Sequence, residues 1–151
     1  MKKCFFMSIV FANPVSENKS AIIFLVIRIG MAFAFLWAGS GKVADPAGFG
    51  MVLQNMAGFE AELAVSMALI IGIFEIISGI FVLIGFLTRP AAIFQIVILI
   101  GAMAMFGFDF TSGPGIWKDP TMLGVAIGLV VYGSGKFGID TIISNRLRFK
   151  K

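Results

Sequence analysis

Long runs of apolar residues set the strongest limit on what this chain can fold into. The first run, about residues 21–38 (AIIFLVIRIGMAFAFLWA), would cover about 27 Å as a helix rising about 1.5 Å per residue. That length is close to the thickness of the hydrocarbon core of a bilayer. Similar runs cover about residues 64–87, 91–108 and, more weakly, 116–132. The sequence therefore predicts an all-α integral membrane protein with four transmembrane helices in one bundle.

The composition excludes most soluble proteins and most self-contained enzymes. Charged residues make up 13% of the 151 residues and apolar residues 59%, whereas a soluble domain carries roughly 25% charged residues. The chain has no histidine and a single cysteine, Cys4. It therefore lacks the residues for a Cys/His zinc site, a CxxC redox pair, a bis-His haem site or Ser–His catalysis. We expect no metal site, no intrinsic cofactor, no catalytic residues and no activity by the chain alone.

Polar segments divide the chain into an N-terminal lead-in (1–20), a four-helix transmembrane domain (21–135) and a basic tail (136–151). The stretch MKKCFFMSIVFA (1–12) is either a short lead-in or an uncleaved signal-like segment. Residues 45–60 (DPAGFGMVLQNMAGFE) are too short to cross a membrane. Asp45 as a cap, Pro46 after it and an apolar face predict a short amphipathic helix in the first external loop. This helix lies on the membrane surface or folds back toward the bundle.

The distribution of lysine and arginine predicts the orientation of the bundle. Four spans place the N-terminus, the turn at 88–90 and the C-terminus on one side. That side carries nine basic residues: Lys2, Lys3, Lys19, Arg89, Lys136, Arg146, Arg148, Lys150 and Lys151. The other side carries only Lys42 and Lys118. Positive residues favour the cytoplasmic side, so both termini are predicted to be cytoplasmic and the protein to lie in the cytoplasmic (inner) membrane. Basic residues placed in this way indicate membrane orientation, and we expect no nucleic-acid partner.

Arg28 and Glu75 are ionisable residues well inside the first two predicted spans, and the amide Gln95 lies inside the third. A charge near the centre of a bilayer costs on the order of 3 kcal/mol, so such residues usually face the interior of a bundle and find partners there. We expect the three to form one buried polar network. The network either holds three helices in register or binds a ligand or a proton. Gly72 and Gly79 flank Glu75 on one helical face, which favours close helix packing and leaves room beside the carboxyl group.

A second set of residues is predicted to lie at the membrane interfaces: Lys42, Thr88, Arg89, Trp117 and Asp119. Trp117 is typical of an interfacial anchor, and Asp119 of a helix cap. Arg89 either binds a lipid phosphate or extends its charge toward the headgroups.

Three segments together resemble the DoxX-like family of small membrane proteins: RIGMAFAFLWAGSGKVADPAGF (28–49), EIISGIFVLIGFLTRPAA (75–92) and WKDPTMLGVAIGLVVYGSGKFGID (117–140). They carry the residues Arg28, Lys42, Glu75, Thr88, Arg89, Asp119 and Asp140 in register with that family. The resemblance implies a four-helix bundle in the cytoplasmic membrane. It also implies a link to quinone-dependent oxidoreductases, because some relatives resemble subunits of the thiosulfate–quinone type.

The residues and the resemblance together favour an accessory or structural subunit of a membrane complex, most simply a quinone-linked redox complex. Such a subunit would contact membrane lipids, other membrane subunits and possible quinone or lipid ligands, while a partner carries the redox centre. The alternative is a carrier of a small solute or a lipid that acts as a homo-oligomer. We find no internal repeat of the kind common in transporters, because Arg28 has no counterpart in the second half.

Overall fold

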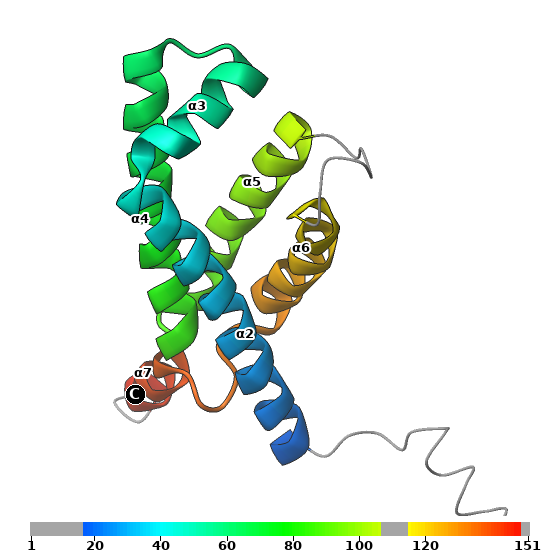
Figure 1. Ribbon diagram of the computed structural model, residues 1–151. Coiled ribbons are helices and arrows are strands. Elements are labelled where there is room, and N and C mark those ends of the chain that lie inside the picture. Colours follow the sequence, from blue (N-terminus) through cyan, green and yellow to red (C-terminus); the bar gives the residue numbers. More distant parts are fainter. Residues whose placement is uncertain (1–16, 107–114, 149–151) are drawn as a thin grey trace, which may run out of the picture.

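The computed structural model describes residues 17–106 and 115–148, and every element in these two ranges is a helix (Figure 1). The elements are α2 (Glu17–Ala44), α3 (Pro46–Ala57), α4 (Ala61–Ile84), α5 (Thr88–Phe106), α6 (Gly115–Tyr132) and α7 (Ile139–Arg148). The predicted lead-in or signal-like segment at 1–12 lies outside the described residues.

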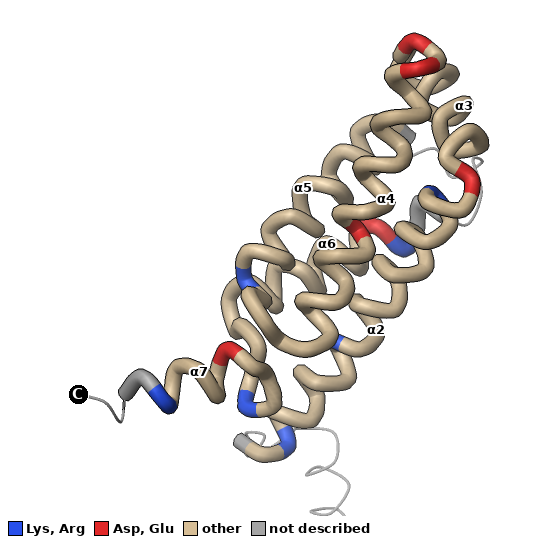
Figure 2. The backbone as a smooth tube through the Cα atoms, turned by 90° about the vertical axis from the view of Figure 1, so that its left-hand side faces the viewer, with Lys and Arg blue, Asp and Glu red and all other residues tan. Residues whose placement is uncertain are grey.

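Three of these helices are long and apolar enough to cross a membrane: Asn18–Ala44, Ala61–Ile84 and Thr88–Met105. The helix α6, with 18 residues, packs along α5 and completes the four-helix bundle that the sequence predicts. The helix α2 packs chiefly against α4, so the bundle consists of two helix pairs. Figure 2 shows that Lys and Arg gather at the end of the bundle that carries α7, as the count of basic residues leads one to expect.

Glycines bring α2 and α4 into close contact. A Cβ atom added at Gly39 would lie 2.6 Å from the carbonyl oxygen of Gly72, and one at Gly72 would lie 2.9 Å from the Cβ of Lys42. Nearer the other end of the pair, a Cβ at Gly79 would lie 3.0 Å from Leu36. A larger residue at Gly39 would move a backbone, and one at Gly72 or Gly79 would displace the neighbouring side chains. The small face around Glu75 that the sequence shows is therefore the surface on which α2 packs.

The short helix α3 folds back onto α4. Asp45 caps it, since its Oδ1 accepts a hydrogen bond from the N–H of Gly48 at 2.9 Å, and Pro46 occupies its first turn. Gly58 ends it in the left-handed conformation, with φ of 70°. Leu53 is buried against Ala64 and Ala68 of α4. The predicted short helix after the first span is thus present, and it packs against the bundle.

Several boundaries differ from those predicted. The helices α4 and α5 each begin three residues earlier than expected, so the turn between them lies at 85–87 and not at 88–90. The helix α2 continues through GSGK to Ala44, past the predicted end of the first span at residue 38. Neither Gly39 nor Gly41 ends it, because Gly39 lies in the tight contact with α4 and is held there. The basic tail also contains a helix, α7, which was not predicted from the sequence. The extension of α2 matters for the site, because it adds Lys42 to a helix that faces α4.

Candidate functional site

A buried ion pair joins α2 to α4. The Nζ of Lys42 lies 2.7 Å from Oε2 of Glu75, and their side chains are 13% and 5% exposed. Lys42 stands in the last turn of α2 and Glu75 near the middle of α4. The Gly39–Gly72 contact, one turn from each residue, brings the two backbones close enough for this pairing. The ammonium group also lies 4.7 Å from the centre of the Phe49 ring, where the face of the ring attracts a cation.

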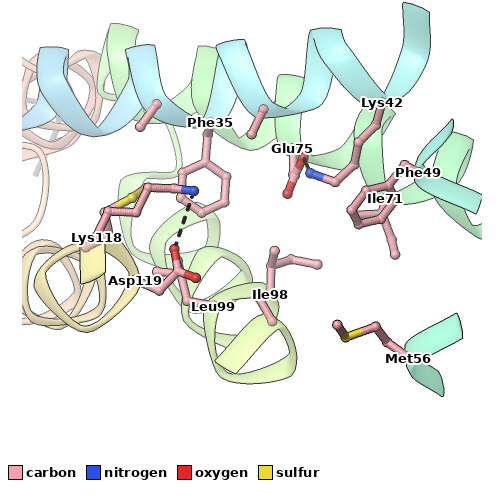
Figure 3. A pocket seen from close by; sticks show the side chains of 14 residues that line it. Phe35, Lys42, Phe49, Met56, Ile71, Glu75, Ile98, Leu99, Lys118 and Asp119 are labelled. Carbon is pink, nitrogen blue, oxygen red and sulfur yellow. Dashed lines mark hydrogen bonds and ion pairs between the residues drawn. The ribbon is translucent and has the colours of Figure 1, made fainter. Parts of the chain in front are cut away.

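The ion pair lines a cavity of about 440 Å³ inside the bundle (Figure 3). Five helices contribute to its wall, namely α2, α3, α4, α5 and α6. Its lining residues are Ala34, Phe35, Ala38, Lys42, Phe49, Met56, Ile71, Glu75, Ile98, Leu99, Ala102, Lys118, Asp119 and Met122. The wall is therefore apolar except for two lysines and two carboxylates. Cavities of roughly 300–1,000 Å³ with this kind of lining are typical of small-molecule sites.

The second charged pair of the cavity comes from the start of α6. Asp119 is 9% exposed, and its Oδ1 lies 3.8 Å from the Nζ of Lys118, whose side chain is 61% exposed. Figure 3 shows the carboxyl groups of Asp119 and Glu75 on different walls of the same open space. At 3.8 Å the Lys118–Asp119 contact is loose, and the carboxylate of Asp119 lines the cavity. The site thus offers ammonium donors and carboxylate acceptors inside an apolar surround.

Arg28 lies in the first half of α2 and is satisfied by the backbone. It is 1% exposed. Its Nε donates to the carbonyl of Val82 at 2.9 Å, and its two terminal nitrogens donate to the carbonyls of Leu83 at 2.7 Å and Ser134 at 2.6 Å. Helix C-termini leave carbonyl groups without partners, and these groups carry partial negative charge. Arg28 therefore closes the last turn of α4 and the segment after α6.

The expected single network of Arg28, Glu75 and Gln95 does not form among the described residues. All three are buried, as predicted, at 1%, 4% and 0% exposure. Arg28, however, meets α4 at Val82, seven residues and therefore about 10 Å from Glu75 along the helix. Glu75 pairs with Lys42 instead. The side-chain amide of Gln95 has no hydrogen-bond partner in the part of the chain that the structure describes.

The predicted interfacial residues take different positions. Lys42 and Asp119 line the cavity. Thr88 is fully buried as the first residue of α5; its N–H donates to Oδ2 of Asp140 at 3.0 Å, while its hydroxyl has no partner among the described residues. Arg89 is exposed and donates to the carbonyl of Val131 at 3.3 Å. Trp117 belongs to α6, but its side chain lies outside the described residues.

The role of Lys42 is the residue assignment that sequence reasoning missed. The signal was present in two places. GSGK continues a helical run, and Gly39 and Lys42 on one helix have the same spacing of three residues as Gly72 and Glu75 on the other. Antiparallel packing sets Gly39 beside Glu75 and Lys42 beside Gly72. Lys42 can then reach Glu75 only if the first helix continues past Gly39, and the glycines suggested that it stops.

Comparison with known proteins supports a membrane assignment for the whole bundle. The inner membrane protein YphA of Escherichia coli K12 is 29% identical over 128 residues, which cover 79% of this chain and 89% of YphA. The inner membrane protein YqjF of the same organism is 29% identical over 127 residues, which cover 81% of this chain and 92% of YqjF. No solved structure is significantly similar to the chain. These relatives and the three apolar spans indicate a multi-pass protein of the inner membrane.

The DoxX family model matches residues 23–108. This range is more than half of the chain and runs from α2 to the end of α5, so it contains Arg28, Lys42, Glu75 and Gln95, whereas Asp119 lies beyond it. The chain therefore belongs to the DoxX family.

Proposed function

We propose that this protein is an accessory subunit of a quinone-linked membrane redox complex, and that its cavity holds the quinone headgroup. The observation that carries the proposal is the meeting of two carboxylates and two ammonium groups in one largely apolar cavity. A charged group inside a membrane protein is a mark of function when it faces a cavity. Here all four charged groups do so.

The chemistry of the lining fits a flat ring with oxygens at opposite ends. Lys42 and Lys118 supply N–H donors for carbonyl oxygens, and Glu75 and Asp119 supply acceptors for the hydroxyl groups of the reduced ring. Phe35 and Phe49 supply aromatic surface against which a ring can pack. Because the cavity lies within a membrane bundle, an apolar tail can extend between helices into lipid. Quinones supply two-electron and two-proton chemistry when they bind.

The absence of histidine and of paired cysteines assigns the electron-carrying centre to a partner. The chain contains no histidine and one cysteine, so a bound metal cluster or haem of the usual ligation would have to belong to another subunit. This protein would then bind and orient the quinone and anchor its partner. Contacts with membrane lipids follow from its three apolar spans.

The test is to purify the chain in mild detergent from its native membrane and to identify all retained molecules by native mass spectrometry. We expect retained quinone and larger redox subunits. We also expect Glu75→Gln or Lys42→Gln to lower retention of a short-chain benzoquinone added to the purified protein by about 10-fold or more. That factor corresponds to loss of a hydrogen bond to a charged group, worth about 1.5–3 kcal/mol.

Glu62→Gln is the matched control, because Glu62 lies exposed in the first turn of the same helix. It changes the same charge on α4 without touching the cavity, and it should leave quinone retention unchanged. A folded protein that retains neither quinone nor any partner subunit would contradict the proposal. The cavity would then be tested in liposomes for the flux of small solutes or lipids.

A further inference from the structure

The interior face of α5 carries two polar side chains whose hydrogen-bonding groups are unpaired. Gln95 and Thr88 are both 0% exposed, and their spacing of seven positions places them on the same side of the helix. The amide nitrogen and oxygen of Gln95 and the hydroxyl oxygen of Thr88 have no hydrogen-bond partner among the described residues. Such groups are rare in folded proteins, because a buried polar atom without a partner has lost its bonds to water and gained none. The partner must come either from a neighbouring helix or from a small molecule.

The side chains packed around Gln95 do not supply these bonds. The buried α5 residues one turn before and one turn after Gln95 belong to a core cluster that joins α2, α4, α5 and α6. Its buried members are all apolar: Met31, Ala32, Phe35, Val82, Ala91, Ala92, Leu99, Ala126 and Leu129. Ser78 of α4 is buried too, but its hydroxyl donates to the carbonyl of Glu75 in its own helix at 3.0 Å. A partner for Gln95 is therefore small, and it both donates and accepts hydrogen bonds, as an amide requires.

Gln95 and Thr88 are placed so that a small ligand can bond to both. Seven positions correspond to about 10 Å along a helix axis. Long side chains in helices point back toward the N-terminus, so the side chain of Gln95 extends toward the turn of Thr88 and covers part of this distance. The buried residues between them on this face are Ala91 and Ala92. No large side chain of α5 therefore separates the two polar groups.

We infer that internal water binds between Gln95 and Thr88, in the core of the bundle and apart from the cavity proposed to hold a quinone. The amide of Gln95 donates to this water and accepts from it, and the hydroxyl of Thr88 bonds to the same water molecule or to the next one. Water is the small partner that donates and accepts, and a buried water molecule typically makes about three such bonds. Neither Gln95 nor Thr88 lines the cavity, so the inference is independent of the proposed function.

The internal water exchanges through the end of the bundle that carries α7. Thr88 is the first residue of α5, and its N–H donates to Oδ2 of Asp140 at 3.0 Å. Asp140 also lines a polar recess at the surface. In the other direction, Phe35 and Leu99 stand between Gln95 and the cavity, because both belong to the core cluster and to the cavity wall. The hydroxyl of Thr88 therefore lies between surface water and Gln95.

The test uses the two glutamines of the chain, Gln95 and Gln54, whose side-chain amides can be labelled selectively with nitrogen-15. Gln54 lies on α3 and is only partly buried, so it serves as the internal reference. The full chain is reconstituted into lipid bilayers, and solid-state NMR measures magnetisation transfer from water to each amide and the rate of deuterium exchange. We expect transfer from water to the Gln95 amide, together with deuterium exchange about 10-fold or more slower than at Gln54, as for water held inside a stable structure.

Thr88→Val keeps the shape of the side chain and removes its hydroxyl, so it should lower the transfer from water to Gln95 by about 3-fold or more. Thr88→Ser keeps a hydroxyl and should preserve the transfer. Thr121→Val is the matched control, because it makes the same substitution at an exposed position of α6, and it should change nothing.

A Gln95 amide that receives no magnetisation from water in the unaltered chain would overturn the inference, since the amide would then be bonded to the main chain. This outcome does not depend on whether any variant folds. Equal transfer in Thr88→Val and Thr88→Ser would overturn the assignment of Thr88 as the second residue of the site.

Discussion

The two ends of the bundle both bury charge, and they use it differently. At the end that carries α7, here called the basic end, Arg28 directs its nitrogens to three backbone carbonyls and leaves no described donor toward a cavity. At the opposite end, here called the cavity end, Lys42, Glu75 and Asp119 face an open space of about 440 Å³. A buried charge whose donors are all hydrogen-bonded to backbone carbonyls stabilises the fold. A buried charge beside a cavity is available to a ligand, so burial alone does not tell the two roles apart.

The largest effect on stability is expected from Arg28→Met, which leaves the carbonyls of Leu83 and Ser134 without the donor that Arg28 supplies and that of Val82 with the N–H of Gly85 at 3.3 Å. Each buried acceptor left unpaired costs about 1–3 kcal/mol, so the loss should be about 2 kcal/mol or more. Thermal unfolding in detergent, followed by circular dichroism, measures it. Lys19→Met, at an exposed position of the same helix, is the control and should change little. An Arg28→Met protein as stable as this control would show that the basic end does not depend on its guanidinium.

Gly39→Ala should come next, because its Cβ would lie 2.6 Å from a backbone oxygen of α4. Overpacking of this kind costs about 1–3 kcal/mol, and separation of α2 from α4 also separates Lys42 from Glu75. The same unfolding measurement, together with quinone retention, should show losses in both. Gly41→Ala is the matched control, since a Cβ there meets nothing within 4 Å. Equal behaviour of the two variants would mean that the close crossing does not position the ion pair.

Asp140→Ala tests the cap that the basic end supplies to α5 from a distant part of the chain. Loss of a capping side chain typically costs about 1 kcal/mol, and the N–H groups of Leu87 and Thr88 would lose their acceptor. Hydrogen exchange at these two amides should rise more than exchange in α4. Ser144→Ala changes an exposed residue of the same helix and should leave both amides protected. Unchanged hydrogen exchange at these two amides in Asp140→Ala would show that α7 does not stabilise the start of α5.

The smallest effect on stability is expected where the effect on function is largest, in the double variant Lys42→Met/Glu75→Met. Replacement of a buried ion pair by apolar residues of similar size is often neutral or stabilising, so unfolding should change by less than about 1 kcal/mol. Quinone retention should nevertheless be lost. Lys42→Met alone leaves a buried carboxylate unpaired and should cost more stability than the double variant. A double variant as unstable as Arg28→Met would show that the ion pair, like Arg28, serves mainly to stabilise the fold.

The four long helices could be predicted because apolar runs of membrane-spanning length admit few other folds, whereas the short helix α7 in the basic tail was not predicted. Asp45 and Pro46 likewise predicted where α3 begins, since capping depends on neighbours in the sequence. The burial of Arg28, Glu75 and Gln95 followed from their positions within the runs. These features depend on local sequence, on the thickness of the bilayer, or on both.

The partners of the buried charges could not be predicted, because they depend on how far one helix is shifted along another. Arg28 and Glu75 were expected to share a network, but the register of α2 on α4 places them about two turns apart. That register is set where Gly39 meets Gly72. Lys42 was assigned to the interface because GSGK resembles a helix stop, whereas packing against α4 keeps these residues helical. The position of Asp119 in the cavity likewise depends on the approach of α6 to α2 and α4.

The contacts of Arg28 also have a consequence for the order in which the chain is made. Its acceptors in α4 lie 54 and 55 residues later in the sequence, and the third acceptor, Ser134, lies 106 residues later. When Arg28 leaves the ribosome, none of these carbonyls has yet been made. Because its guanidinium then has no partner, transfer of α2 from the insertion machinery into lipid is unfavourable. The first two long helices should therefore enter the membrane together. A nascent chain that ends before Val82 should resist carbonate extraction less well than one that ends after Leu87, although both contain the whole of α2.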